Sequence, residues 1–123
     1  MDRNAPPLAL LVDDEAVIRM EMCDLLIDAG FDVVEAWSTA TALDQLARHP
    51  DISLLFTDVN MPGPLNGFAL ARAVAVSWPE IRIVVASGVS RPAAQDMPVG
   101  ARFIDKPFSP RLVVETVREM RAD

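Results

Sequence analysis

Five polar residues at the ends of short, mostly apolar runs are the candidates for chemistry in this sequence: Asp13, Asp14, Asp58, Ser87 and Lys106. The first two follow the first run, and the others follow the third, fourth and fifth runs. If these runs are parallel strands and the first lies beside the third, three carboxylates converge. Carboxylates at that distance repel each other and raise one another's pKa unless a cation compensates.

The residue types indicate which cation and which reaction this cluster would serve. Oxygen ligands without histidine or cysteine suit magnesium, which uses one or two carboxylates and keeps several waters. A carboxylate can attack phosphorus and form an acyl phosphate. Magnesium and the ammonium group of Lys106 would neutralise the phosphoryl oxygens, and the hydroxyl of Ser87 would donate to one of them. The set predicts a magnesium site that handles a phosphoryl group.

The elements that would position these residues alternate between strands and helices. The expected strands cover residues 8–12, 31–36, 52–57, 81–86 and 101–105. This alternation predicts an α/β fold, in which a parallel sheet is covered on both faces and joined by right-handed crossovers. In such a sheet the site lies outside the carboxyl ends of the strands, where the strand order reverses.

Helix signals separate the expected strands. Helices are expected at 15–29, from the N-cap Ser38 to about 48, at 67–77, and from the N-cap Ser109 to about 121. Gly30 is the stop signal of the first helix. Between 87 and 100, Pro92 and Pro98 leave room for only a short helix.

Composition limits the classes of protein to consider. The 123 residues fit one domain, expected to span 1–123, and 51% of them are hydrophobic. A net charge of -7 argues against binding to nucleic acid or to an anionic membrane. Cys23 is the single cysteine, so neither a disulfide framework nor a thiolate metal site is expected. With no targeting or membrane-spanning segment evident, we expect a soluble, cytoplasmic protein.

The motifs around these residues resemble the receiver domains of bacterial response regulators, the CheY-like family, over essentially the whole chain. The matching segments are Leu11-Val12-Asp13-Asp14-Glu15, Phe56-Thr57-Asp58-Val59-Asn60-Met61-Pro62-Gly63, Ala86-Ser87-Gly88 and Asp105-Lys106-Pro107-Phe108. The resemblance implies a doubly wound, flavodoxin-like sheet of five strands in the order 2-1-3-4-5.

The resemblance also implies roles for single residues. Asp58 would be the phosphoacceptor and, with the others, a magnesium ligand. Asp14 would bind the ion directly, Asp13 mainly through water, and Asn60 through its backbone carbonyl.

Three further roles follow from the same resemblance. Lys106 would contact the phosphoryl group, with a cis peptide bond before Pro107. Ser87 and Phe103 match the hydroxyl and aromatic positions whose coupled shift signals phosphorylation in many relatives. Plain core packing is nearly as good an interpretation of Phe103, since an aromatic residue on a central strand is usually buried.

The expected function is therefore that of a phosphorylation switch. A histidine kinase or phosphotransfer protein would supply the phosphoryl group, and an unidentified protein target would read the change, with phosphorylation-dependent homodimerisation left open. The chain would catalyse only its own phosphotransfer and autodephosphorylation. The residues after Phe108 suffice for one helix, so we expect either a stand-alone single-domain receiver or a piece of a larger protein.

Two departures from the family pattern leave an alternative open. The loop after Asp58 is one residue longer than usual, and the segment before Lys106 is shorter and contains prolines, which predicts a shortened or irregular fourth helix. A pseudo-receiver that binds partners without phosphorylation is the alternative. A haloacid-dehalogenase-type phosphatase would need a second aspartate where Asn60 stands. A flavin carrier would need a phosphate-binding loop where Asp13 and Asp14 stand.

Overall fold

The computed structural model describes residues 6–61, 63, 65–88, 92 and 96–121. Its strands are β1 (Leu8–Val12), β2 (Asp32–Ala36), β3 (Ile52–Asp58), β4 (Arg82–Ser87) and β5 (Arg102–Asp105). Its helices are α1 (Ala16–Asp28), α2 (Thr39–Arg48), α3 (Gly67–Ser77) and α4 (Pro110–Arg121). The expected elements are confirmed with small shifts of their ends, so that Asp58 and Ser87 are the last residues of their strands.

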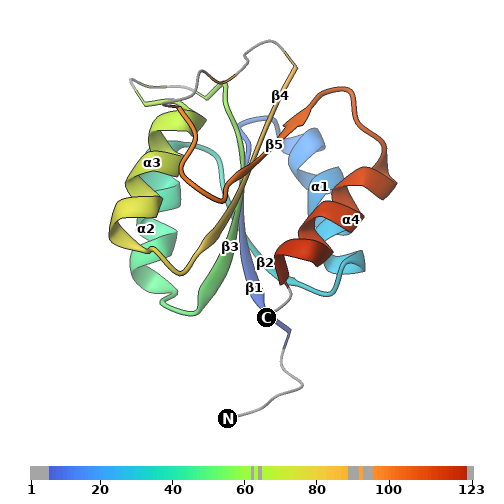
Figure 1. Ribbon diagram of the computed structural model, residues 1–123, viewed down its shortest axis with the longest axis horizontal. Coiled ribbons are helices and arrows are strands. Elements are labelled where there is room, and N and C mark those ends of the chain that lie inside the picture. The colour runs from blue at the N-terminus through green and yellow to red at the C-terminus, as the bar shows by residue number, and fades with distance from the viewer. Residues whose placement is uncertain (1–5, 62, 64, 89–91, 93–95, 122–123) are drawn as a thin grey trace.

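The five strands form one parallel sheet in the order β2-β1-β3-β4-β5, which confirms the predicted fold class. Helices α2 and α3 lie on one face of the sheet, and α1 and α4 lie on the other (Figure 1). Because β1 has β2 on one side and β3 on the other, the strand order reverses between β1 and β3. This is the place where doubly wound sheets bind their ligands.

Two apolar layers fix the sheet between its helices. Alternate residues of β1 point to opposite faces, as they must in a strand. Leu10 packs in the layer under α2 and α3, with Leu46 and Val74, whereas Leu11 packs in the layer under α1 and α4. The two faces of β1 are therefore both buried, which explains why its sequence is a continuous apolar run.

The connection from β4 to β5 differs from the other crossovers. Its described residues, 88, 92 and 96–101, contain no helix, in agreement with the expected shortening or irregularity at this position. The helix expected at the end of the chain is α4. Two prolines of the longer loop after Asp58, at positions 62 and 64, lie outside the described residues.

The N-cap of α2 gives a first prediction, because its capping residue was expected from the sequence and is confirmed. The Ser38 hydroxyl accepts a hydrogen bond from the Thr41 amide at 3.1 Å, and the Thr41 hydroxyl accepts one from the Ser38 amide at 3.0 Å. Ser38→Ala should therefore lower the free energy of unfolding by about 1 kcal/mol. Urea denaturation measures this change, and Ser77→Ala, at the exposed end of α3, is the control that should leave stability nearly unchanged.

Candidate functional site

The carboxyl ends of β1 and β3 bring the predicted site residues together. In the parallel register Val12 lies beside Thr57, so the next residues, Asp13 and Asp58, stand at the same level on adjacent strands. Asp14 follows in the turn to α1. The convergence inferred from the sequence is therefore confirmed by the strand order.

The three carboxylates form a compact cluster. One oxygen of each of Asp13, Asp14 and Asp58 lies within 4.8 Å of the others. Opposite ligands of one magnesium ion are about 4.2 Å apart, since each bond is about 2.1 Å long. Three carboxylate oxygens this close together could therefore hold one hard divalent cation such as magnesium. Asp13 and Asp58 are buried and Asp14 is exposed, which leaves one open side.

Burial perturbs the carboxyl group of Asp13. Its pKa is raised above the ordinary aspartate value, mainly because burial disfavours the charged form. The charges of Asp58 and Asp14 raise the pKa further, whereas the amide of Glu15 and the ammonium of Lys106 act in the opposite direction. Without a metal ion, the negative charge of Asp13 therefore costs the folded protein stability.

This cost predicts that Asp13→Asn stabilises the metal-free protein. The asparagine oxygen can still accept the 2.9 Å hydrogen bond that the Glu15 amide donates to Asp13 Oδ1, and the charge is gone. A pKa that is higher in the folded state means that wild-type stability falls as pH rises from the ordinary aspartate pKa through the raised one. Above that window the variant should be more stable by on the order of 1 kcal/mol. Urea denaturation in EDTA from pH 4 to 8 tests this, with the exposed Asp32→Asn as control.

Lys106 supplies the positive charge at the site. Its Nζ donates to Asp58 Oδ1 at 3.1 Å, and the side chain is partly buried. Its backbone amide donates to the carbonyl of Ser87 at 3.0 Å, which ties the end of β5 to the end of β4. The peptide bond between Lys106 and Pro107 is cis, as expected. The Lys106 ammonium group is thus held beside the carboxylate predicted to be the phosphoacceptor.

The other predicted residues are placed at the same edge of the sheet or next to it. Ser87 is 1% exposed and pairs in register with Asp105. Asn60 is exposed, two residues after Asp58. Phe103 lies on β5, which is an edge strand and not, as expected, a central one. It is half-buried and stacks on Phe68 of α3, with ring centroids 6.3 Å apart. Core packing of Phe103 is therefore observed, while the switching role of this residue and the carbonyl ligand from Asn60 stay predictions.

Two residues that shape the site were missed by the sequence reasoning. Arg19 of α1 donates from Nη1 to the carbonyl of Asp13 at 2.9 Å. Gly67 begins α3 against the backbone of Asp58. A signal for Arg19 was present in the sequence. A cation near the start of a helix interacts unfavourably with the helix dipole, which indicates that another contact of Arg19 offsets this effect. No comparable signal existed for Gly67.

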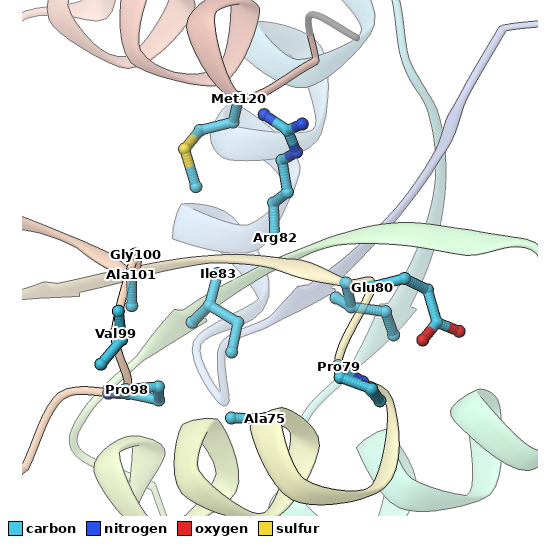
Figure 2. Close-up of a pocket in the computed structure, with 11 residues that line it drawn as sticks. Ala75, Pro79, Glu80, Arg82, Ile83, Pro98, Val99, Gly100, Ala101 and Met120 are labelled. Atoms are coloured by element: carbon cyan, nitrogen blue, oxygen red, sulfur yellow. The ribbon is translucent and has the colours of Figure 1, made fainter.

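A separate cavity lies at the opposite edge of the sheet. It has a volume of about 570 Å³ and is lined by the start of β4, the residues before β5 and the end of α3. Figure 2 places Arg82 and Met120 on one side of the strand, and Ile83 and Ala75 on the other. Its only charged lining residues among those described are Glu80 and Arg82. The convergent polar groups are therefore at the other edge, around Asp58.

Known proteins include clear relatives of this chain. The family model described as "Response regulator receiver domain" matches residues 9–118. The chain belongs to this family. It is 33% identical to the chemotaxis protein CheY of Thermotoga maritima over 116 residues, which cover 90% of this chain and 94% of CheY. It is also 32% identical to the sensor kinase CckA of Brucella abortus over 123 residues, which cover 97% of this chain.

The chain spans only 13% of the length of CckA. Among solved structures, the chemotaxis response regulator CheY4 of Vibrio cholerae superposes with a TM-score of 0.80 at 29% identity, covering 94% of this chain and 99% of CheY4. Among the described residues, no helix has the length and apolar character needed to cross a bilayer.

Proposed function

We propose that this chain accepts a phosphoryl group on Asp58, from a histidine kinase or phosphotransfer protein, in a magnesium-dependent reaction. The observation that carries the proposal is the position of Asp58, which has two further carboxylates on one side and Lys106 Nζ 3.1 Å from its own Oδ1. Membership in the receiver family supports it, because receivers act as phosphoacceptor switches. The proposal includes one receiver domain over 1–123 and a cytoplasmic location.

The arrangement suggests how the transfer proceeds. Asp13, Asp14 and Asp58 would hold the magnesium ion together with the carbonyl of Asn60, and the bound ion supplies positive charge to the phosphoryl oxygens. A carboxylate oxygen of Asp58 attacks phosphorus in line with the leaving group. The phosphorus–nitrogen bond of phosphohistidine breaks, and its electron pair stays on the imidazole. The Asp58 side chain then carries an acyl phosphate.

Lys106 and Ser87 would act on the transferred group. The ammonium of Lys106 is already beside Asp58 Oδ1, from where it can contact a phosphoryl oxygen. The hydroxyl of Ser87, at the adjacent strand end, would donate to another oxygen. A phosphoryl group that binds one arrangement of Ser87 and Phe103 better than the other shifts the population toward it. We infer that the stack of Phe103 on Phe68 changes in that shift, and that a protein partner reads the result.

One observation favours the alternative of a pseudo-receiver. The described residues of the β4–β5 connection form no helix, at a surface where the family pattern has its fourth helix. A partner could bind such a surface without phosphorylation. The intact set of Asp13, Asp14, Asp58 and Lys106 argues for the phosphorylated switch as the first candidate.

The test is intact-mass spectrometry after incubation with acetyl phosphate, with and without magnesium. We expect a gain of about 80 Da that requires magnesium and is absent in Asp58→Asn. Asp51→Asn, an exposed aspartate at the opposite edge of the sheet, is the matched control and should be phosphorylated like the wild type. A folded wild-type protein that gains no mass, and shows no response to magnesium or beryllofluoride, would favour the pseudo-receiver.

A further inference from the structure

Arg19 joins the ends of two strands at the acidic site. It lies near the start of α1, and its side chain is 19% exposed. Its Nη1 donates to the backbone carbonyl of Asp13 at 2.9 Å. Its Nε pairs with Oε1 of Glu35 on β2 at 2.8 Å. One guanidinium group therefore bridges the end of β1 and its neighbour β2.

Together with this bridge, two further hydrogen bonds hold Asp13 at its backbone and at its side chain. Its amide donates to the carbonyl of Ala36 at 3.1 Å. Its carbonyl accepts from Arg19, and its Oδ1 accepts from the amide of Glu15 at 2.9 Å. These contacts fix the backbone from which the carboxylate of Asp13 extends. The guanidinium contacts the carbonyl and not the carboxylate, so it acts on Asp13 through position.

Helix stability does not explain the placement of Arg19. A cation near the N-terminal end of a helix is unfavourable toward the helix dipole, and ordering a long side chain costs conformational entropy. Groups that orient metal ligands from behind commonly change metal affinity when they are removed. We propose that Arg19 is a positioning residue, which holds Asp13 against Glu35 so that the Asp13 carboxylate faces the magnesium ion. This inference rests on the proposed function.

The test compares Arg19→Met with Arg118→Met. Methionine keeps most of the apolar stem of arginine and removes every donor. Arg118 of α4 is the matched control, because it too donates to a backbone carbonyl. Its acceptor is the carbonyl of Asp28 at 3.3 Å, at the C-terminal end of α1 and far from Asp13. Magnesium affinity is measured from amide chemical shifts in a titration with magnesium chloride. We expect the Kd to rise about 10-fold in Arg19→Met and to stay at the wild-type value in Arg118→Met.

A metal-free measurement separates positioning from general destabilisation. In EDTA, the Glu15 amide should exchange with solvent faster in Arg19→Met than in the wild type, because its acceptor on Asp13 is less well held. Core amides of β3 should exchange only as fast as the free energy of unfolding of the variant predicts. Arg19→Lys guards against a methionine variant that fails to fold. The lysine ammonium cannot span both acceptors as the guanidinium does, so we expect a Kd between those of wild type and Arg19→Met.

The outcomes distinguish this inference from the proposed function. If the wild type binds magnesium while the folded Arg19 variants bind it as tightly as Arg118→Met, the positioning role is wrong and the proposed function stands. If the wild type shows no magnesium-dependent shift around Asp58, the proposed function fails and the inference fails with it. A raised Kd together with faster exchange at Glu15 supports the positioning role.

Discussion

Lys106→Met is expected to slow the phosphorylation of Asp58 by acetyl phosphate by about 100-fold or more at saturating magnesium. The ammonium of Lys106 lies 3.1 Å from Asp58 Oδ1, and Lys106 is the single lysine in the sequence. Charge develops on the phosphoryl oxygens during transfer, and a fixed cation beside them stabilises the transition state more than the ground state. Methionine has a similar length and fills the same space, so the loss should be electrostatic.

The rate is measured by intact-mass spectrometry at successive times, with Arg111→Met as the control. Arg111 carries the same charge, but it lies on α4 and pairs with Glu115 at 2.8 Å on an exposed surface. Its loss should leave the rate unchanged, which would exclude an effect of net charge on donor binding. If Lys106→Met were phosphorylated as fast as the control, the ammonium would have no part in the transfer, and magnesium alone would have to neutralise the phosphoryl group.

The sequence pattern predicted the α/β class and the members of the acidic cluster, and the family resemblance supplied the strand order. Each strand is a short apolar run that ends in a polar residue, and the rule for doubly wound sheets then places Asp13, Asp58 and Lys106 at one edge. The register of Val12 with Thr57 and the contact of Lys106 with Asp58 confirm this placement. The motifs carried this information because each lies within a few residues of a strand end, where backbone geometry determines the position.

The sequence was not sufficient for contacts between elements that are distant along the chain. The ion pair of Arg19 with Glu35 joins α1 to β2, and no local sequence pattern specifies which charged residues of the two elements will pair. Phe103 could pack or switch, and only its distance from Phe68 shows that it packs on α3. The described residues of the β4–β5 connection form no helix, in agreement with the expectation from its prolines, since proline removes a backbone donor and disrupts a helix. The shape of the molecular surface at this connection could not be derived from composition.

At the acidic cluster, the requirements of folding stability and of metal binding oppose each other. Burial and neighbouring charges raise the pKa of Asp13, so the metal-free fold is strained electrostatically at the point where it would bind magnesium. A buried core on both faces of β1 and β3 supplies the rigidity to hold these carboxylates together. A substitution that removes the buried charge, such as Asp13→Asn, should therefore stabilise the fold and weaken the metal site.

Gly67→Ala is expected to destabilise the protein by about 3 kcal/mol or more, at the upper end of what overpacking costs. A Cβ at this position would overlap the backbone carbonyl oxygen of Asp58 and lie 2.8 Å from the Cα of Val59. Both neighbours are backbone atoms, so no side chain can rotate away. The Gly67 amide also donates to the carbonyl of Val59 at 2.8 Å, which leaves α3 little freedom to shift from the end of β3.

Urea denaturation measures the loss, and Gly63→Ala, in the loop before α3, is the control. Gly63 has a φ of 95°, and outside its two chain neighbours no atom of the described residues lies within 4 Å of the position that a Cβ would take, so we expect backbone strain to be the main cost of an alanine there. That strain costs about 1–2 kcal/mol.

Because the clash in Gly67→Ala acts on Asp58 itself, this variant should also bind magnesium more weakly, whereas Gly63→Ala should not. Equal stability losses and an unchanged magnesium Kd in both variants would mean that α3 moves away from β3 without displacing Asp58. The close approach of Gly67 would then be a packing feature with no influence on the acidic cluster.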